Sequence, residues 1–152
     1  MSTAHTFQPH VTVAAVTERD GRFLFVREPV HGRQVLNQPA GHVEDGESFI
    51  EAIIRETKEE TCWDFDPQGL VGLYRWHTPS RSKTFIRVCF HGPVTGFYEQ
   101  ATRDPVIDSV HWLSARELQQ RQPEHRSPLV AACLDDYLTG KRYPLDLLID
   151  LP

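Results

Sequence analysis

The sequence lacks the features that mark membrane-spanning, secreted and disulfide-rich proteins. No stretch approaches the roughly 20 apolar residues of a transmembrane helix, and residues 1–10 contain no apolar run of the signal-peptide type. The three cysteines, Cys62, Cys89 and Cys133, are widely spaced, and no C-x-x-C pair occurs. This pattern argues against a disulfide framework or a structural zinc site, and reduced thiols in a cytoplasmic protein fit it best.

Basic charge is also scarce. The 16 Lys and Arg residues face 21 Asp and Glu residues, so the formal net charge is −5, and no basic stripe is visible. We therefore expect no nucleic-acid partner and no membrane partner. A small phosphate-bearing substrate remains compatible, because a bound divalent metal reverses the local charge. The length of 152 residues and the average composition predict a single domain over 1–152, as a monomer or small homo-oligomer.

Apolar and turn-forming residues predict a chain that mixes strands with helices. Strands are predicted at 11–17, 22–27, 34–38, 70–77, 84–90 and 109–113, with a hairpin turn at Asp20-Gly21 and a break at Pro39-Ala40-Gly41. Helices are predicted at 48–61, over a short stretch from Ser114, and between Ser127-Pro128 and Gly140. This order predicts an α/β fold in which a mixed sheet packs between helices.

The helix predicted at 48–61 carries an acidic face. Glu56, Glu59 and Glu60 stand at i, i+3 and i+4, so their side chains share one side of the helix. Three adjacent carboxylates repel one another, and a hard divalent cation with oxygen ligands removes that repulsion. Gly41 precedes the helix, and its bare backbone can approach such a cation closely. The pattern predicts a platform for Mg²⁺, with Mn²⁺ as the alternative. The apolar side is expected to hold Ile50, Ile53, Ile54, Thr57 and Thr61.

Arg55 is expected to aim these carboxylates. It can pair with Glu59 at i+4 and reach back to Glu47 at the start of the helix, since a guanidinium holds carboxylates in a fixed fork. A structural interpretation stays open for the acidic face taken alone. Acidic helix faces are common, and Glu51 and Lys58 fit a solvated helix with weak ion pairs.

The full spacing resembles the signature of the Nudix hydrolases, G-x5-E-x7-R-E-U-x-E-E-x-G-U, where U is a bulky aliphatic residue. The chain departs from it at Thr57, which replaces an aliphatic residue, and at Cys62 and Trp63, which replace the final glycine and aliphatic residue. Because that glycine favours a left-handed backbone, we expect a strained helix exit at Cys62 and an intact metal site. The matching residues are Gly41, Glu47, Arg55, Glu56, Glu59 and Glu60.

Further segments resemble the NudJ-type bacterial phosphatases of that family. The similarity extends over most of residues 7–148 and includes 9–14, 37–42, 126–130 and 142–145. It implies a mixed β-sheet sandwiched between α-helices, with the signature as a loop–helix–loop. It also implies hydrolysis of nucleoside di- and triphosphates and of the pyrimidine diphosphate precursor of thiamine, with release of orthophosphate.

The resemblance suggests a role for each signature residue. Glu56, Glu59, Glu60 and the carbonyl of Gly41 are expected to hold Mg²⁺ or Mn²⁺, and Glu59 or Glu60 is expected to take a proton from the attacking water. Glu47 and Arg55 would orient the cluster from behind.

Other residues are weaker candidates for contact with the substrate. His42 follows Gly41 in the loop and can contact phosphate, although a plain loop role fits it equally well. Trp76 or Tyr74 offers a ring that can stack on a base, although core packing is the more usual role of such aromatics. Asp108 precedes a predicted strand in a region where many family members carry an extra acidic residue, as does Asp104, but a turn also explains an aspartate there. Four strand arginines complete the set: Arg27, Arg33, Arg75 and Arg87.

Two other functions remain open at this point. The first is a Nudix pyrophosphatase for ADP-ribose, a dinucleoside polyphosphate or an RNA 5′ end, of which the acidic charge disfavours the RNA end. The second is a non-catalytic nucleotide-binding Nudix module. Such modules commonly lose signature glutamates, and this chain retains all of them.

Overall fold

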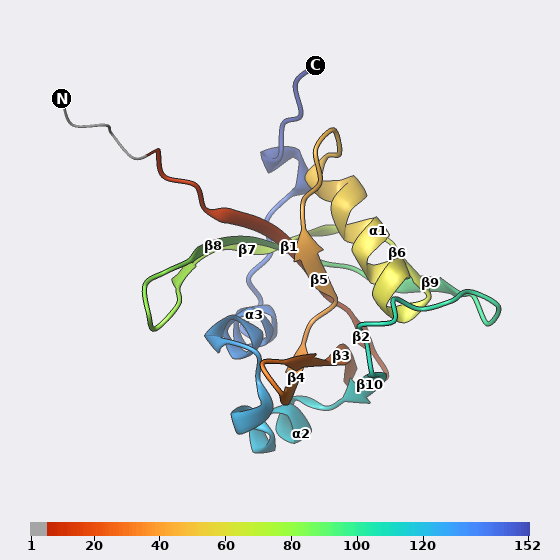
Figure 1. The fold of residues 1–152 in the computed structure, drawn as a ribbon. Coiled ribbons are helices and arrows are strands. Elements are labelled where there is room, and N and C mark those ends of the chain that lie inside the picture. Colours follow the sequence, from red (N-terminus) through yellow and green to blue (C-terminus); the bar gives the residue numbers. More distant parts are fainter. Residues whose placement is uncertain (1–5) are drawn as a thin grey trace.

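The computed structural model describes residues 6–152 (Figure 1). Its helices are α1 (Phe49–Thr61), α2 (Ala115–Gln120) and α3 (Pro128–Leu138), with short 3-10 turns η1 (Gln122–Glu124) and η2 (Leu145–Leu147). Its strands are β1 (His10–Val16), β2 (Glu18–Arg19), β3 (Arg22–Val30), β4 (Arg33–Asn37), β5 (Ala40–His42), β6 (Trp63–Phe65), β7 (Gly69–His77), β8 (Thr84–His91), β9 (Val94–Phe97) and β10 (Ser109–Leu113).

A four-stranded sheet lies at the centre, in the order β5-β1-β8-β7. Strand β1 pairs in parallel with β8 and antiparallel with β5, so this sheet is mixed. Alternate side chains of β1 belong to different cores, because successive residues of a strand point to opposite faces. Val13 and Ala15 pack with Ile53 of α1, whereas Ala14 and Val16 pack with Val130 of α3. The predicted α/β sandwich is therefore confirmed, with α1 and α3 on opposite faces (Figure 1).

Smaller sheets extend this centre. Strand β3 pairs with β10, β2 and β4, all antiparallel, and β6 pairs with β9 just after α1. Within residues 6–152, no helix is long and apolar enough to cross a membrane.

The longer predicted elements are confirmed, and the shortest ones were not predicted. Each predicted strand overlaps an observed one, and both capping boxes form, at Ser48 with Glu51 and at Ser114 with Glu117. The predicted break at 39–41 is wrong for its last two residues, because Ala40 and Gly41 extend along β1 as part of β5. Strands β2, β5, β6 and β9 have between two and four residues, too few to show an alternating pattern.

The buried side of α1 is rotated relative to the prediction. Ile53, Thr57 and Thr61 are buried as expected, but Ile54 is 36% exposed. Ala52 and Glu60 are buried in its place. One consequence is that one carboxylate of the acidic face points inward, toward the sheet.

The exit of α1 has the left-handed backbone that the sequence predicts. Cys62 caps the helix with φ 63° and ψ 16°, and its N–H donates to the carbonyl of Lys58. We expect Cys62→Gly to be more stable to unfolding than Cys62→Ala by about 1 kcal/mol, because only the alanine keeps a Cβ in this conformation. Thermal and urea unfolding of the two variants measures the difference. Equal stability, or a more stable alanine variant, would contradict the assigned backbone.

Candidate active site

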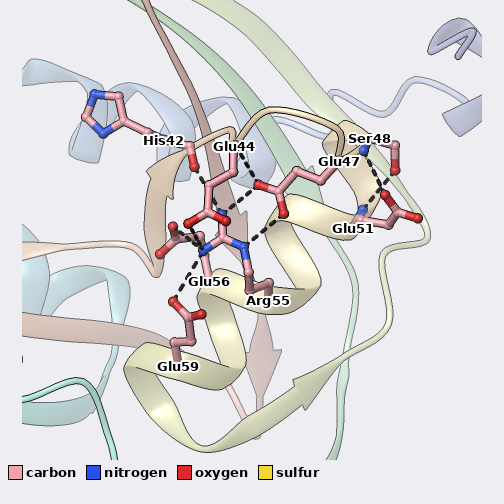
Figure 2. A network of polar contacts seen from close by, with 8 residues as sticks. All are labelled: His42, Glu44, Glu47, Ser48, Glu51, Arg55, Glu56 and Glu59. Carbon is pink, nitrogen blue, oxygen red and sulfur yellow. Dashed lines mark hydrogen bonds and ion pairs between the residues drawn. The ribbon is translucent and has the colours of Figure 1, made fainter.

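Arg55 is the centre of a network of carboxylates at the start of α1 (Figure 2). Its guanidinium donates to both oxygens of Glu47 at 2.9 and 2.6 Å, to Glu56 Oε1 at 2.8 Å and to Glu59 Oε2 at 3.2 Å. It also donates to the carbonyl of His42 at 3.1 Å. Both contacts predicted for Arg55, with Glu47 and Glu59, are thus present. The hydrogen bond from Arg55 lowers the pKa of Glu47, so this carboxylate remains charged.

Glu60 occupies a different environment from its neighbours. Its side chain is 7% exposed, and one carboxylate oxygen accepts a hydrogen bond from the N–H of Ala40 at 2.8 Å. Burial raises the pKa of Glu60 to about 9, and the nearby charges of Glu56, Glu28 and Asp104 add to the effect. Burial also raises the pKa of Glu56, against the opposing effect of Arg55. Negative charge is therefore costly here unless a cation balances it.

These residues fit a divalent cation, although their side chains do not yet converge on one point. Across residues 6–152, no three acidic, histidine or cysteine side chains form a ready metal-binding group. Arg55 holds Glu56 and Glu59, and Ala40 holds Glu60. Two observations favour a cation: Glu60 is buried without a positively charged partner among residues 6–152, and the oxygen-only donor set suits a hard metal.

Gly41 lets the backbone of β5 lie close to Glu56, while its predicted close approach to a cation stays a prediction. It lies on β5 opposite Val13, and a Cβ at this position would overlap the carboxylate of Glu56. Only a glycine therefore lets the β5 backbone and the Glu56 side chain lie this close together.

A pocket of about 500 Å³ opens beside β5, on the face of the sheet that α3 covers. His42, Trp76 and Arg87, three of the predicted substrate contacts, line this pocket together with Gly41. Several lining residues were not among the predicted contacts: Thr12, Glu28, Asn37, Lys83, Phe85 and Arg126. Asn37 and Arg126 lie in the segments 37–42 and 126–130, so the resemblance of those segments was a signal that could have identified them.

The other predicted contacts are not among the lining residues. Arg33 donates to the carbonyl of Pro123 at 2.9 Å, and Arg75 is exposed on β7. Arg27 lies on β3 opposite Ser109, and Asp108 is exposed at the turn before β10. Arg27 is absent from the pocket because successive residues of a strand point to opposite faces, and it is the next residue, Glu28, that faces the pocket. The carboxylate of Glu28 pairs with Arg126. The structure therefore does not bring these four residues to the pocket.

Comparison with known proteins identifies the family. The model of the NUDIX domain matches residues 6–133, which is most of the chain. The chain is a Nudix hydrolase. Phosphatase NudJ of Escherichia coli K12 is 40% identical to it over 144 residues, covering 95% of this chain and 93% of that protein. This Nudix hydrolase is accordingly a phosphohydrolase enzyme.

Solved structures agree with the family and the fold. A NUDIX hydrolase from Nitrosomonas europaea superposes with a TM-score of 0.92 at 46% identity, covering 95% of this chain and 98% of that one. A MutT NUDIX hydrolase from Burkholderia pseudomallei has a TM-score of 0.71 at 20% identity, covering 86% and 98%, which shows the shared fold alone. Nudix hydrolases generally use divalent metal cations and act on small molecules, in keeping with the acidic face and the adjoining pocket.

Proposed function

We propose that this enzyme is a Mg²⁺-dependent phosphatase of nucleoside di- and triphosphates and of the pyrimidine diphosphate precursor of thiamine, releasing orthophosphate. Mn²⁺ is the alternative metal. The observation that carries the proposal is that β5 joins the two halves of the site. Glu60 of the acidic face binds the N–H of Ala40, while Ala40, Gly41 and His42 border the pocket. A phosphate chain beside β5 can thus meet the metal while its organic group enters the pocket.

The proposal is supported by 40% identity over nearly the full length to a protein named as a phosphatase. We also propose that the enzyme is cytoplasmic and has no nucleic-acid partner. Cys62, Cys89 and Cys133 are free thiols, as reducing compartments require. The net charge of −5 opposes binding to a phosphate backbone.

Each signature residue has a distinct place in the proposed mechanism. The cation would be held by Glu56, Glu59, Glu60 and the Gly41 carbonyl. A bound cation would neutralise charge on the phosphate and lower the pKa of a water molecule. Glu59 is the better placed base, because its side chain is half exposed and, within the described part of the chain, forms a hydrogen bond with Arg55 alone. Glu60 is buried against Ala40 and is therefore better suited to a ligand than to a base that exchanges protons with water. Arg55 and Glu47 would keep these carboxylates in position.

Orthophosphate release tests this proposal directly. Purified protein with Mg²⁺ would be assayed on GTP, GDP and the thiamine-precursor diphosphate, with orthophosphate and pyrophosphate detected separately. We expect metal-dependent orthophosphate from all three. Pyrophosphate from GTP with GDP left intact would overturn the phosphatase assignment in favour of a pyrophosphatase. Absence of turnover on these and other diphosphates would favour the binding module.

Metal binding should depend on pH through Glu60. An unfolded glutamic acid releases its proton near pH 4.5, whereas the folded Glu60 keeps it up to about pH 9. The metal-free fold therefore binds the proton more tightly than the unfolded chain, and this contribution to stability is lost as pH rises through that window. Mg²⁺ must displace the same proton, so we expect it to raise Tm more at pH 9 than at pH 6. Differential scanning fluorimetry measures both shifts, and equal shifts at the two pH values would contradict the assignment.

A further inference from the structure

Arg87 of β8 is a buried guanidinium with only neutral partners. Its side chain is 5% exposed, and it donates to Gln38 Oε1 and Asn37 Oδ1, each at 3.1 Å. Within residues 6–152, no carboxylate lies within ion-pair distance of Arg87, its Nη1 also reaches Cys133 Sγ at 3.9 Å, and its Nε is buried without a hydrogen-bond partner. Burying a charge without a counter-charge is costly, so a function other than stability is the better explanation for an arginine here.

The amide partners of Arg87 are oriented by their own hydrogen bonds. Gln38 donates through Nε2 to the carbonyl of Val130 at 2.8 Å, which turns its oxygen toward the guanidinium. Arginine has no acceptor, so Asn37 must also present its oxygen to Arg87 and turn its NH₂ group away. Asn37 and Arg87 both line the pocket. Because the oxygen of Asn37 is held by Arg87, both side chains offer N–H donors rather than acceptors to the pocket that they line.

Aromatic rings form the neighbouring wall of the pocket. Phe85 and Trp76 are paired across β8 and β7, with ring centroids 5.8 Å apart and planes inclined by 26°. Phe85 lies two residues before Arg87 and on the same face of the sheet. His10 stacks on the other side of Phe85, with ring centroids 5.1 Å apart, so the wall presents ring edges to the pocket. A ring that packs against these edges lies beside Arg87 and Asn37.

Arg87 lies two strands away from β5, beside which the reacting phosphate is proposed to lie. Thr12 of β1 stands between His42 of β5 and Arg87 of β8 in one cross-strand row. The backbones of β5 and β8 are therefore about 10 Å apart, which is two strand spacings. A substrate with its reacting phosphate at β5 therefore meets Arg87 with its organic group.

We propose that Arg87 and Asn37 select a planar heteroaromatic ring with hydrogen-bond acceptors on its edge, packed against the edges of Trp76 and Phe85. Each terminal nitrogen of Arg87 carries two hydrogens, and Nη2 has one acceptor among the described residues, Asn37 Oδ1. An acceptor on the ring edge can take its second hydrogen. This selection rests on the proposed function for the position of the phosphates, but ring binding itself needs neither metal nor turnover.

The test measures binding without catalysis. Affinities for GMP, CMP and the ring-less ribose 5-phosphate would be determined by calorimetry in metal-free buffer containing a chelator. Arg87→Lys keeps the charge but loses the fork, and Asn37→Asp places a carboxylate against Arg87 that competes for its donors. Arg116→Lys, at an exposed position on α2 outside the pocket, is the matched control. Melting curves confirm that each variant is folded.

We expect GMP and CMP to bind the wild-type enzyme more tightly than ribose 5-phosphate, and each pocket variant to weaken only the ring-bearing ligands, by at least about tenfold. The control should match wild type. Equal weakening of ribose 5-phosphate would show that Arg87 binds phosphate and would overturn the proposal, as would unchanged GMP and CMP affinity in Asn37→Asp. Ring binding without any phosphate release would refute the proposed function and leave the ring site standing.

Discussion

Glu59→Gln is expected to lower kcat for phosphate release by about a hundredfold to ten thousandfold, the usual contribution of a general base. Glutamine keeps the size and the oxygen of the side chain but cannot accept the proton of the attacking water. The fold should be retained, because the Glu59 side chain is half exposed and its one side-chain partner among the residues that the structure describes is Arg55, at 3.2 Å. Arg55 keeps its closer contacts with Glu47 and Glu56. Phosphate release under saturating Mg²⁺, with Tm measured beside it, checks both parts.

Glu51→Gln on the same helix is the matched control for Glu59→Gln. Glu51 lies on the opposite end of α1 and accepts from the N–H of Ser48 in the capping box. Glutamine serves equally well at that position of a capping box, so this variant should retain both stability and activity. Near-normal turnover in Glu59→Gln would reject Glu59 as the base. A comparable loss in Glu51→Gln would mean that any carboxylate removed from α1 harms activity indirectly.

The acidic face is predictable from sequence because it depends only on the 3.6-residue period of an α-helix. Once 48–61 is a helix, Glu56, Glu59 and Glu60 must share a side, and Arg55 must lie within reach of Glu59. The left-handed exit at Cys62 was predictable from the resemblance instead, because the family signature has a glycine at this position. What the period does not reveal is that Glu60 alone points into the protein, because burial depends on how α1 is set against the sheet.

The pocket depends instead on the order of strands in the sheet. His42 and Arg87 face the same space only because β1 lies between β5 and β8. Residue type alone therefore made Arg33 and Arg75 as good candidates for substrate contact as Arg87, although neither of them lines the pocket. Asn37 carries no charge and so gave no chemical signal of its own, yet it presents its oxygen to Arg87.

Gly41→Ala is expected to lower kcat/KM by about a hundredfold while leaving the fold intact, since a displacement of about 1 Å at a catalytic group has effects of this size. A Cβ on Gly41 would overlap the Glu56 carboxylate, which is the end of a flexible side chain. Glu56 can rotate away at little cost to stability, but it then leaves its hydrogen bond with Arg55 and the position proposed for the metal. The substitution thus displaces a proposed metal ligand rather than the backbone, and Mg²⁺ titrations of activity should show a weaker apparent affinity for the metal.

Gly96→Ala separates this effect from the general cost of replacing a strand glycine. Gly96 lies on β9, and a Cβ there would meet only Asp64 Oδ2, at 3.6 Å, which is ordinary contact. This variant should retain the activity and the Mg²⁺ requirement of the wild-type enzyme. If Gly41→Ala also retains them within about threefold, Glu56 does not need its observed position for turnover. The metal would then have to be held chiefly by Glu59 and Glu60, and the close approach at Gly41 would serve packing rather than chemistry.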